Sequence, residues 1–521
     1  MKKKVAIILA VLLAISLFVG CGADDPAPSE NDTVQQPADE PAEDEQDPAE
    51  QSGRDDVIIQ LAGDITSFNP FTHALAADSF VYRQIYDTLL HLTPDGELEY
   101  RLAESFTVNE DSTVFTFRIR EGVLFHNGDE LQASDVVFTL LYYLESPFLS
   151  TFVGGIADAR DLGDNVVEVT MHYPNSPFLL YLAEMVPILS ERAITEAGED
   201  YDDAPVGTGP YMFVSYARGN QIVLTRFEDY WRGPAPIRDV TLRIIPDTTT
   251  AVIALQAGDI DFSIVMPPDF ESVNNDPNLT IGYSPMQSGD MVILNHGQAP
   301  FDDVLVRQAA SYAIDREFIL EATREGLGEV ATNILPPGVF GHSPDIEMTY
   351  HYNPERAMEL LAQAGITEPI DIGTIITIEP FALTAQIVQQ NLADVGLVGT
   401  VEVMEIGRLN ESLVIGDFGI GVIQITLSAD ADSWSAILIH ENIDGMNFAR
   451  YYNPLISELF ASARQTADPD ERLEIYTELF RIVGEEVAYI TVVFPRGNFA
   501  WNHQLNAPPI VNIHIFDMYW D

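Results

Sequence analysis

The sequence predicts an α/β fold, because short strand patterns alternate with helical patterns along the chain. The stretch Val206–Phe262 shows this order most clearly. It holds two runs of alternating apolar residues, Tyr211–Tyr216 and Gln221–Phe227, separated by hairpin-forming residues. A strand, Val240–Ile245, then leads into an apolar helical pattern, Thr248–Ala257, that a glycine ends. The stretch contains no nucleophile–base pair, metal cluster or phosphate loop.

The rest of the chain shows the same alternation. We expect helices where Asp or Asn precedes an apolar stripe and strands where apolar residues alternate. In chain order, the further predicted elements are the strand Val57–Leu61, the helix Ser79–Leu90, the strand Phe115–Ile119, the helix Ala133–Tyr143, the strand Val166–His172, the strand Val292–Asn295, a helix after Asp303, the helix Pro354–Ala364, the helix Phe381–Leu392, the helix Asp468–Tyr489 and the strand Ile490–Phe494.

The N-terminus has the features of a secretory signal. Three lysines form a positive segment, and Val5–Val19 is an apolar run of signal-peptide length, short for a spanning helix. Phe18-Val19-Gly20-Cys21 resembles a lipobox, with Phe18 where such boxes usually carry Leu. We therefore expect Cys21 to become the lipidated first residue of the mature chain. The alternative is an ordinary cleaved signal followed by an incidental cysteine.

Residues 22–54 consist almost entirely of Ala, Pro, Asp, Glu, Gln and Ser. Such a segment buries too little apolar surface to offset its ordering entropy, so it is expected to be a disordered tether. Cys21 is the only cysteine. The mature domain is therefore expected to hold no internal disulfide and no thiolate metal cage.

The chain is extremely acidic. It has 81 Asp and Glu residues against 25 Lys and Arg, a formal net charge of -56, and every basic residue beyond Lys4 is arginine. A surface this negative repels phosphate groups and argues against nucleic acid as a partner. Because the acidic residues are spread along the sequence, they indicate a saline or alkaline milieu rather than a docking patch.

Several motifs lie in an order and at spacings typical of one family. Gly207–Tyr211 reads GTGPY, and it is followed by the DYW-x-G of Asp229–Gly233 and by the GDID of Gly258–Asp261. Two longer blocks, Leu102–Thr139 and Asn295–Arg316, complete the pattern. Together they resemble the extracytoplasmic solute-binding proteins of family 5, the peptide/nickel-type receptors of ABC importers, from about residue 57 to the C-terminus.

The resemblance implies a periplasmic-binding-protein-like, two-lobed fold of the cluster C type, with an extra small subdomain and lobes joined by two crossover strands. The implied divisions are a signal peptide at 1–20, the lipidated Cys and disordered acidic tether at 21–56, lobe I at 57–90, 200–293 and 490–521, the subdomain at 91–199, and lobe II at 294–489. The implied activity is capture of oligopeptides or dipeptides in the cleft between the lobes and delivery to a membrane permease. Neither catalysis nor a cofactor is expected, and the receptor is expected to be a lipid-anchored monomer on the extracytoplasmic face of the cell membrane.

The resemblance also implies a ligand-binding segment at Ser428–Trp434. In peptide-binding relatives an aspartate here pairs with the ligand's α-ammonium group, and an aromatic–Leu pair follows seven residues on. Counting from Asp430 places Ile437-Leu438 at that spacing. Gln424–Leu427 lack the Arg or Trp that peptide receptors often carry just upstream, which leaves recognition of the ligand carboxylate open.

Other positions are candidates to line the same cleft. Trp434 either stacks on a ligand or packs its own loop. Asp290 precedes the first crossover strand, and Phe494 lies on the second. The loop His73–Ala76, including Leu75 and Ala76, suits contact with a ligand backbone or a plain surface loop.

Three conspicuous side chains are expected to be structural. His126 has no partner at a metal-ligand spacing, so it is interpreted as part of a turn. Arg307 and Arg316 could be mistaken for anion-binding residues, but in the resembling proteins they are mainly structural.

Other functions remain as alternatives. The same fold serves receptors for oligosaccharides, nickel chelates, haem and opines, and a sensor without a transport role would have the same sequence features. Bare nickel is disfavoured, because ten histidines are scattered without a cluster. A secreted hydrolase would need a nucleophile elbow, an HExxH helix or paired catalytic acids, and the sequence has neither of the first two.

Overall fold

The computed structural model describes residues 53–72, 76–93, 97–146, 149–285, 288–343, 346, 350–428, 430–466, 468–507 and 514–521. It confirms the α/β fold. The largest sheet has 12 strands in the order β16-β15-β17-β13-β18-β11-β1-β10-β9-β8, and β12 and β14 also pair with β18. Its strands are β1 (Asp56–Leu61), β8 (Tyr211–Ala217), β9 (Gln221–Arg226), β10 (Asp239–Ile244), β11 (Phe262–Ile264), β12 (Leu279–Pro285), β13 (Ser288–Leu294), β14 (Gly328–Val330), β15 (Ile370–Thr377), β16 (Leu397–Val403), β17 (Ile420–Thr426) and β18 (Ile490–Asn502).

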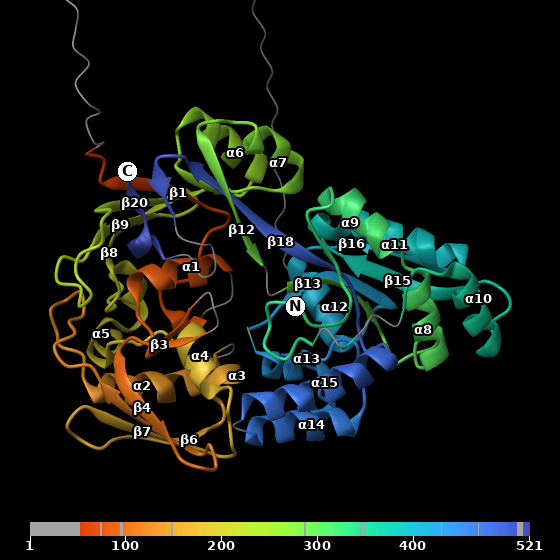
Figure 1. Ribbon diagram of the computed structural model, residues 1–521, viewed down its shortest axis with the longest axis horizontal. Helices are drawn as coiled ribbons and strands as arrows, with labels where there is room; N and C mark the ends of the chain where they lie inside the picture. Colours follow the sequence, from red (N-terminus) through yellow and green to blue (C-terminus); the bar gives the residue numbers. More distant parts are fainter. Residues whose placement is uncertain are drawn as a thin grey trace, which may run out of the picture. The chain divides into compact units, whose positions relative to one another are not determined.

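Strand β18 connects the two halves of this sheet (Figure 1). The part of β18 near Ile490 pairs with β13 and β14, and the part near Trp501 pairs with β11 and β12. The sequence pattern predicted a strand at Ile490–Phe494, and the strand continues to Asn502. One continuous strand of 13 residues therefore belongs to both halves.

Helices cover both faces of the half-sheet that contains β13. The run Met291–Leu294 is buried on both sides, as expected for a strand between two layers. Val292 and Leu294 pack in one core cluster with α8 (Val304–Ala313), α9 (Arg316–Arg324), α10 (Pro354–Gln363) and α11 (Ala382–Asp394). Met291 and Ile293 pack in another with α12 (Ile406–Ile415), α13 (Ser435–Leu438), α14 (Pro454–Gln465) and α15 (Pro469–Glu485).

The other half-sheet shares a core with a smaller sheet of four strands. That sheet has the order β4-β5-β7-β6 and is covered by α2 (Ala133–Tyr142). Its strands are β4 (Ala103–Val108), β5 (Val114–Ile119), β6 (Ile156–Asp161) and β7 (Val166–Met171). The remaining elements of this region are α1 (Ala76–Ile85), β2 (Leu90–Leu92), β3 (Leu98–Tyr100), α3 (Ser150–Val153), α4 (Phe178–Glu184), α5 (Glu191–Ala197), α6 (Thr248–Ala257), α7 (Pro267–Asn274), β19 (Leu505–Asn506) and β20 (Tyr519–Trp520).

The GTGPY turn packs directly on the C-terminal end of α1. A side-chain carbon added to Gly207 would lie 2.0 Å from the Ile85 carbonyl oxygen, and one added to Gly209 would lie 2.7 Å from it. The Gly209 N–H donates to that same oxygen over 2.8 Å. Glycine is therefore required at these two positions because two backbones approach closely.

His126 holds this turn. The sequence interpretation expected a structural histidine in its own turn, and the structure adds contacts with the GTGPY turn that were not predicted. The His126 Nε2 bonds the Gly209 carbonyl oxygen at 2.9 Å, and its Nδ1 accepts from the Gly207 N–H at 3.3 Å. One ring nitrogen donates and the other accepts, which is the pattern of a neutral imidazole. Burial lowers the pKa of His126 to about 4.

Several helix boundaries differ from the predicted ones. Helix α1 begins at Ala76 and ends at Ile85, whereas the pattern predicted Ser79–Leu90, because the chain beyond Ile85 leaves the helix to form β2. Helix α15 ends at Glu485 rather than at Tyr489. Helices α3, α4, α5, α7, α9, α12, α13 and α14 were not predicted. The predicted caps at Asp303 and Asn353 are confirmed, since both side chains accept from the first turn of their helices.

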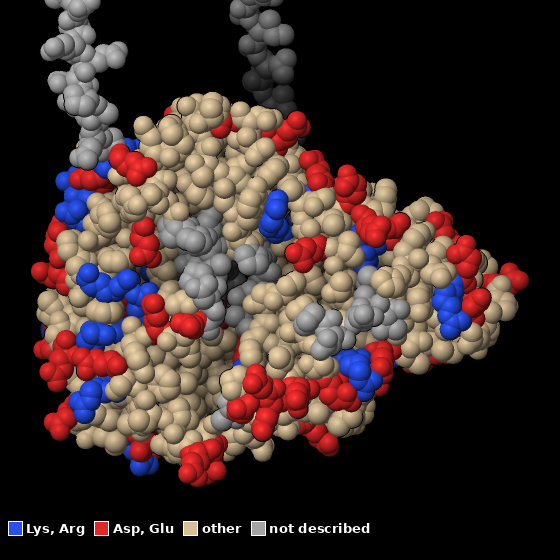
Figure 2. Space-filling model, viewed as in Figure 1, with Lys and Arg blue, Asp and Glu red and all other residues tan. Residues whose placement is uncertain are grey.

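Charged residues are widely distributed over the surface. On the face in Figure 2, Asp and Glu are scattered among uncharged residues rather than gathered in a single patch. Within the described residues, no helix is both long enough and apolar enough to cross a membrane.

Candidate functional site

Asp430 lies at the centre of a buried polar cluster. Its side chain is nearly inaccessible, with 1% of the residue's surface exposed. One carboxylate oxygen accepts from the Asp432 N–H at 2.8 Å and from the Tyr476 hydroxyl at 3.2 Å, and the other pairs with the Arg472 guanidinium. Arg472 also lies over the ring of Phe340, 4.3 Å from its centroid. The carboxylate is thus held on two sides by α15 and on a third by its own loop.

Burial raises the pKa of Asp430 to about 6, although Arg472 acts in the opposite direction. A carboxylate moved out of water favours its neutral form unless a cation compensates for the lost hydration. Asp432, two residues away, adds to the rise because it carries a like charge. A nearby cation therefore stabilises the ionised form of Asp430, and Arg472 is that cation in this structure.

Asp432 joins this cluster to the four-stranded-sheet region. It accepts from the Tyr181 hydroxyl of α4 at 2.9 Å and from Arg464 Nε of α14 at 2.7 Å. The Ser176 N–H, just before α4, donates to the Arg464 carbonyl oxygen at 3.1 Å. The contacts of Tyr181 and Ser176 join segments more than 250 residues apart, so the loop that carries Asp430 lies at the boundary of two core clusters.

Trp434 packs its own loop in this structure. It is fully buried within the core cluster of α12–α15, and its indole Nε1 has no hydrogen-bond partner among the described residues. A buried indole N–H without a partner is unusual.

Asp290 and Phe494 lie on neighbouring strands, β13 and β18, where Asp290 is paired with Val493. Arg324 Nη2 donates to both Asp290 oxygens, at 3.0 and 2.7 Å, and Gln424 donates to one of them at 3.0 Å. Asp290 is 1% exposed and Phe494 is 5% exposed. Each of these two residues is enclosed in this structure.

The remaining predicted positions are Ala76, Leu75 and the lipidation site Cys21. Ala76 is the first residue of α1. Leu75, the loop before it and Cys21 lie outside the described residues. The part of the chain that the structure describes contains no group of His, Cys, Asp and Glu side chains able to hold a metal ion.

Arg307 and Arg316 have the structural role that was expected of them. Arg307 donates to the backbone carbonyls of Phe301, Asp302 and Glu486. Arg316 donates to those of Ser311, Tyr350 and Thr491. Buried guanidinium groups that bond several carbonyls tie loops to strands, and neither contacts the Asp430 cluster.

The pairing of β13, β17 and β18 brings Asp290 and Phe494 near the loop that carries Asp430 and Trp434. Strand β17 pairs with β13 so that Thr426 faces Ser288 and Gln424 faces Asp290. The loop of Asp430 and Trp434 begins just past Thr426, so it continues from the strand end where Asp290 and Phe494 lie.

Sequence reasoning missed the cationic and phenolic partners at this end. They come from α4, α9, α14 and α15, and they are Tyr181, Arg324, Arg464, Arg472 and Tyr476. The only signal in the sequence was the small number of basic residues. The chain has 25 Lys and Arg among 521 residues, and three of these arginines lie at this end. The arrangement is suited to non-covalent recognition through ion pairs and hydrogen bonds.

Comparison with known proteins gives one family. Residues 97–442 match the model of bacterial extracellular solute-binding proteins, family 5 Middle. The Heme-binding protein A of Haemophilus influenzae is 29% identical over 82% of this chain and 85% of its own length. The oligopeptide-binding protein AppA of Bacillus subtilis is 26% identical over 97% of this chain and 96% of its own.

A solved structure agrees. The ABC transporter-associated periplasmic binding protein DppA of Helicobacter pylori, in complex with the peptide STSA, superposes with a TM-score of 0.79 at 25% identity, over 89% of this chain and 98% of that one. The match of the family model covers well over half of the 521 residues, and the solved structure shares the fold. The chain therefore belongs to the bacterial extracellular solute-binding proteins of family 5.

Proposed function

We propose that this chain is the substrate-binding receptor of an ABC importer and that it captures oligopeptides or dipeptides. The observation that carries the proposal is the alignment of nearly the whole chain with a relative named for oligopeptide binding. The peptide held by the H. pylori relative supports the same substrate class. The buried clusters of carboxylates and guanidinium groups at one end of β13, β17 and β18 suit a polar, zwitterionic solute.

The proposed binding site is a cleft between two lobes with the domain boundaries given above. Asp430, Trp434, Asp290 and Phe494 are its candidate ligand contacts, together with Leu75 and Ala76. For Asp430 to pair with a peptide α-ammonium group, that group must take the place of Arg472, since the carboxylate is already bonded. The Asp430 loop and α15 both fall within the proposed lobe II and share one core cluster, so this exchange requires the Arg472 side chain to change its rotamer rather than one lobe to move against the other.

The test is a binding panel measured by calorimetry on the full chain in non-ionic detergent. It contains alanine peptides of two to nine residues, their N-acetylated forms, an oligosaccharide, a nickel–histidine chelate and haem. Peptides are expected to bind, and a ligand at one hundred times its dissociation constant adds about 2.7 kcal/mol to the free energy of unfolding. Binding of only the sugar, the chelate or haem would replace the peptide assignment with that solute.

Asp430→Asn tests the amine contact. It is expected to weaken free-amine peptides to the level of their N-acetylated forms, because the same ion pair is lost in both cases. Asp432→Asn is the matched control, since it is an equally buried carboxylate that pairs with a different arginine. If Asp430→Asn leaves the preference for a free amine intact, Asp430 only holds its loop and the amine is recognised elsewhere.

We also propose that the chain is a lipoprotein, anchored at the extracytoplasmic face of the membrane through Cys21, as a monomer on a disordered tether. The composition of residues 22–54 supports this arrangement. Cys21→Ser is expected to move the protein from the membrane fraction to the soluble extracytoplasmic fraction. Retention of that variant in the membrane fraction would mean that another feature anchors it.

A further inference from the structure

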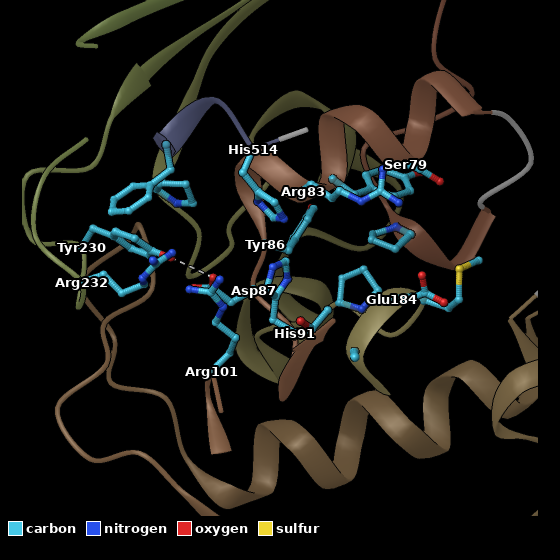
Figure 3. Close-up of a pocket in the computed structure, with 18 of the residues that line it drawn as sticks. Ser79, Arg83, Tyr86, Asp87, His91, Arg101, Glu184, Tyr230, Arg232 and His514 are labelled. Atoms are coloured by element: carbon cyan, nitrogen blue, oxygen red, sulfur yellow. Dashed lines mark hydrogen bonds between the residues drawn. The ribbon is translucent and has the colours of Figure 1, made fainter. Parts of the chain in front are cut away.

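A cavity of about 60 Å³ lies between α1, α4, β2 and the C-terminal segment (Figure 3). Water needs about 10–15 Å³ of such volume per molecule, so the cavity has room for about four to six waters or one small oxyanion. One lining residue, Glu184, accepts a hydrogen bond from Ser428 of the Asp430 loop over 3.3 Å.

Three arginines line this cavity, two of them partly buried away from water and the third, Arg232, exposed. Arg83, from α1, makes no ion pair within the described ranges, and Arg232 contacts only the ring of Phe516 there, at 4.5 Å. Arg101 has a single acidic neighbour at 3.6 Å, Glu99, which is itself 56% exposed. Burial lowers the pKa of Arg83 and Arg101. Glu184 opposes this effect at Arg83, and Asp87 and Glu99 oppose it at Arg101, but neither arginine makes a hydrogen-bonded ion pair with them among the described residues.

Two histidines add neutral donors to the same space. The rings of His91 and His514 lie edge to face with centroids 5.3 Å apart. In Figure 3 they lie between Arg83 on one side and Arg101 and Arg232 on the other. Burial, followed by the effect of nearby cations, lowers the pKa of His91 to about 4 and that of His514 well below its usual value. A neutral imidazole keeps one N–H to donate.

Two carboxylates, Asp87 and Glu184, also border the cavity. Asp87 accepts from the Tyr230 hydroxyl and from Trp231 Nε1, both at 3.0 Å, and burial raises its pKa. Glu184 lies on the Arg83 side in Figure 3. The lining thus holds three guanidinium groups and two acids, and a third acid, Glu99, lies 3.6 Å from Arg101 at its edge. In a chain with a net charge of -56, a lining with excess positive charge is the opposite of the average environment.

We propose that this cavity is a binding site for one small oxyanion, a phosphate or carboxylate group, held by Arg83, Arg101 and Arg232. Guanidinium forks match the geometry of such oxygens, and charge-assisted bonds in an enclosed space are stronger than in water. The two imidazoles complete the set of donors. The inference is independent of which solute the receptor carries.

The experiment follows thermal unfolding of the full chain at constant ionic strength while chloride is replaced by phosphate, sulfate or acetate. The unfolding midpoint is expected to rise with at least one of these anions in a saturable way. Arg232→Gln and Arg83→Gln are each expected to raise the dissociation constant about tenfold or more, the usual effect of losing a hydrogen bond to a charged group. Arg232 is solvent-exposed, so its variant retains the fold even if the Arg83 variant does not.

Arg408→Gln is the matched control. Arg408 lies on α12, its side chain is 65% exposed, and it pairs with Glu402 of β16, so the variant removes the same charge from the surface. Anion stabilisation that persists in this variant and disappears in Arg232→Gln supports the site. The same response in all variants would mean general screening of the acidic surface, and no response to any oxyanion in the wild type would overturn the proposal.

Competition identifies the source of the oxyanion. If phosphate is displaced by a peptide with a free C-terminal carboxylate and not by its C-terminal amide, the cavity holds the acidic end of the solute. If neither displaces it, the cavity holds a free anion beside the solute site.

Discussion

At the scale of single residues, His126 gives a prediction about pH. Its ring is neutral in the folded protein because both nitrogens are engaged by the turn that contains Gly207 and Gly209, and its pKa is lowered to about 4. In the unfolded chain an ordinary histidine has a pKa of about 6.5. The unfolded state therefore binds more protons between these values, so the contribution of His126 to stability is complete above pH 6.5 and is lost as the pH falls toward 4.

Between pH 7 and pH 5 the loss from this one group is about 2 kcal/mol. Denaturant unfolding of the wild type and of His126→Gln at several pH values measures it. The variant is expected to be less stable at pH 7, because the turn loses its hydrogen bonds to the imidazole ring. It is also expected to lose less stability than the wild type when the pH is lowered. Parallel pH profiles would show that His126 titrates in the same way in both states. His91, His296 and His514 remain in the variant, so the difference reports His126 alone.

Residue roles were predictable where the physics is local. The caps at Asp303 and Asn353 depend only on the next turn of the chain. The structural role of His126 was predicted from its own turn, but its partners Gly207 and Gly209, 81 and 83 residues away, were not. The surroundings of Asp430 were not predictable, because Arg472 and Tyr476 reach it from α15, and Tyr181 reaches the neighbouring Asp432 from α4, elements that are distant along the chain. Whether Asp430 binds a ligand remains a prediction.

At the scale of elements, the best-predicted segments carry their own boundary signals. Helix α6 spans Thr248–Ala257 as predicted, since Asp247 accepts from the Thr250 N–H and Gly258 ends the helix in a left-handed conformation with φ of 78°. Strands β8 and β9 pair in an antiparallel hairpin, again as predicted. Boundaries failed where tertiary contacts decide them, as at the end of α1, where the GTGPY turn occupies the Ile85 carbonyl.

The missed helices have a related cause. Helices α9, α12 and α14 are amphipathic. Helices α9 and α12 pack against the sheet, and α14 packs against α15 and α13. Their apolar stripes are short, and the buried residues of α12 are only Leu409, Ser412 and Leu413. Packing against the sheet or against neighbouring helices stabilises such helices more than their own sequence does.

At the scale of the whole molecule, the net charge of -56 is the dominant property. Like charges spread over a folded surface repel one another and destabilise the compact state. The screening length is about 10 Å at 0.1 M salt and about 3 Å at 1 M, so added salt removes most of this repulsion. We expect the unfolding midpoint to rise continuously with NaCl over this range.

Thermal unfolding in NaCl and KCl measures this effect, with sucrose as an uncharged control. The two salts are expected to act alike, because screening depends on ionic strength and not on the cation. Arg232→Gln separates screening from the proposed oxyanion cavity, since that variant loses one cavity cation among 81 unchanged acidic residues and must retain the full salt response. A midpoint that is flat or falls with salt would show that the arginine ion pairs already balance the surface, because screening weakens those pairs.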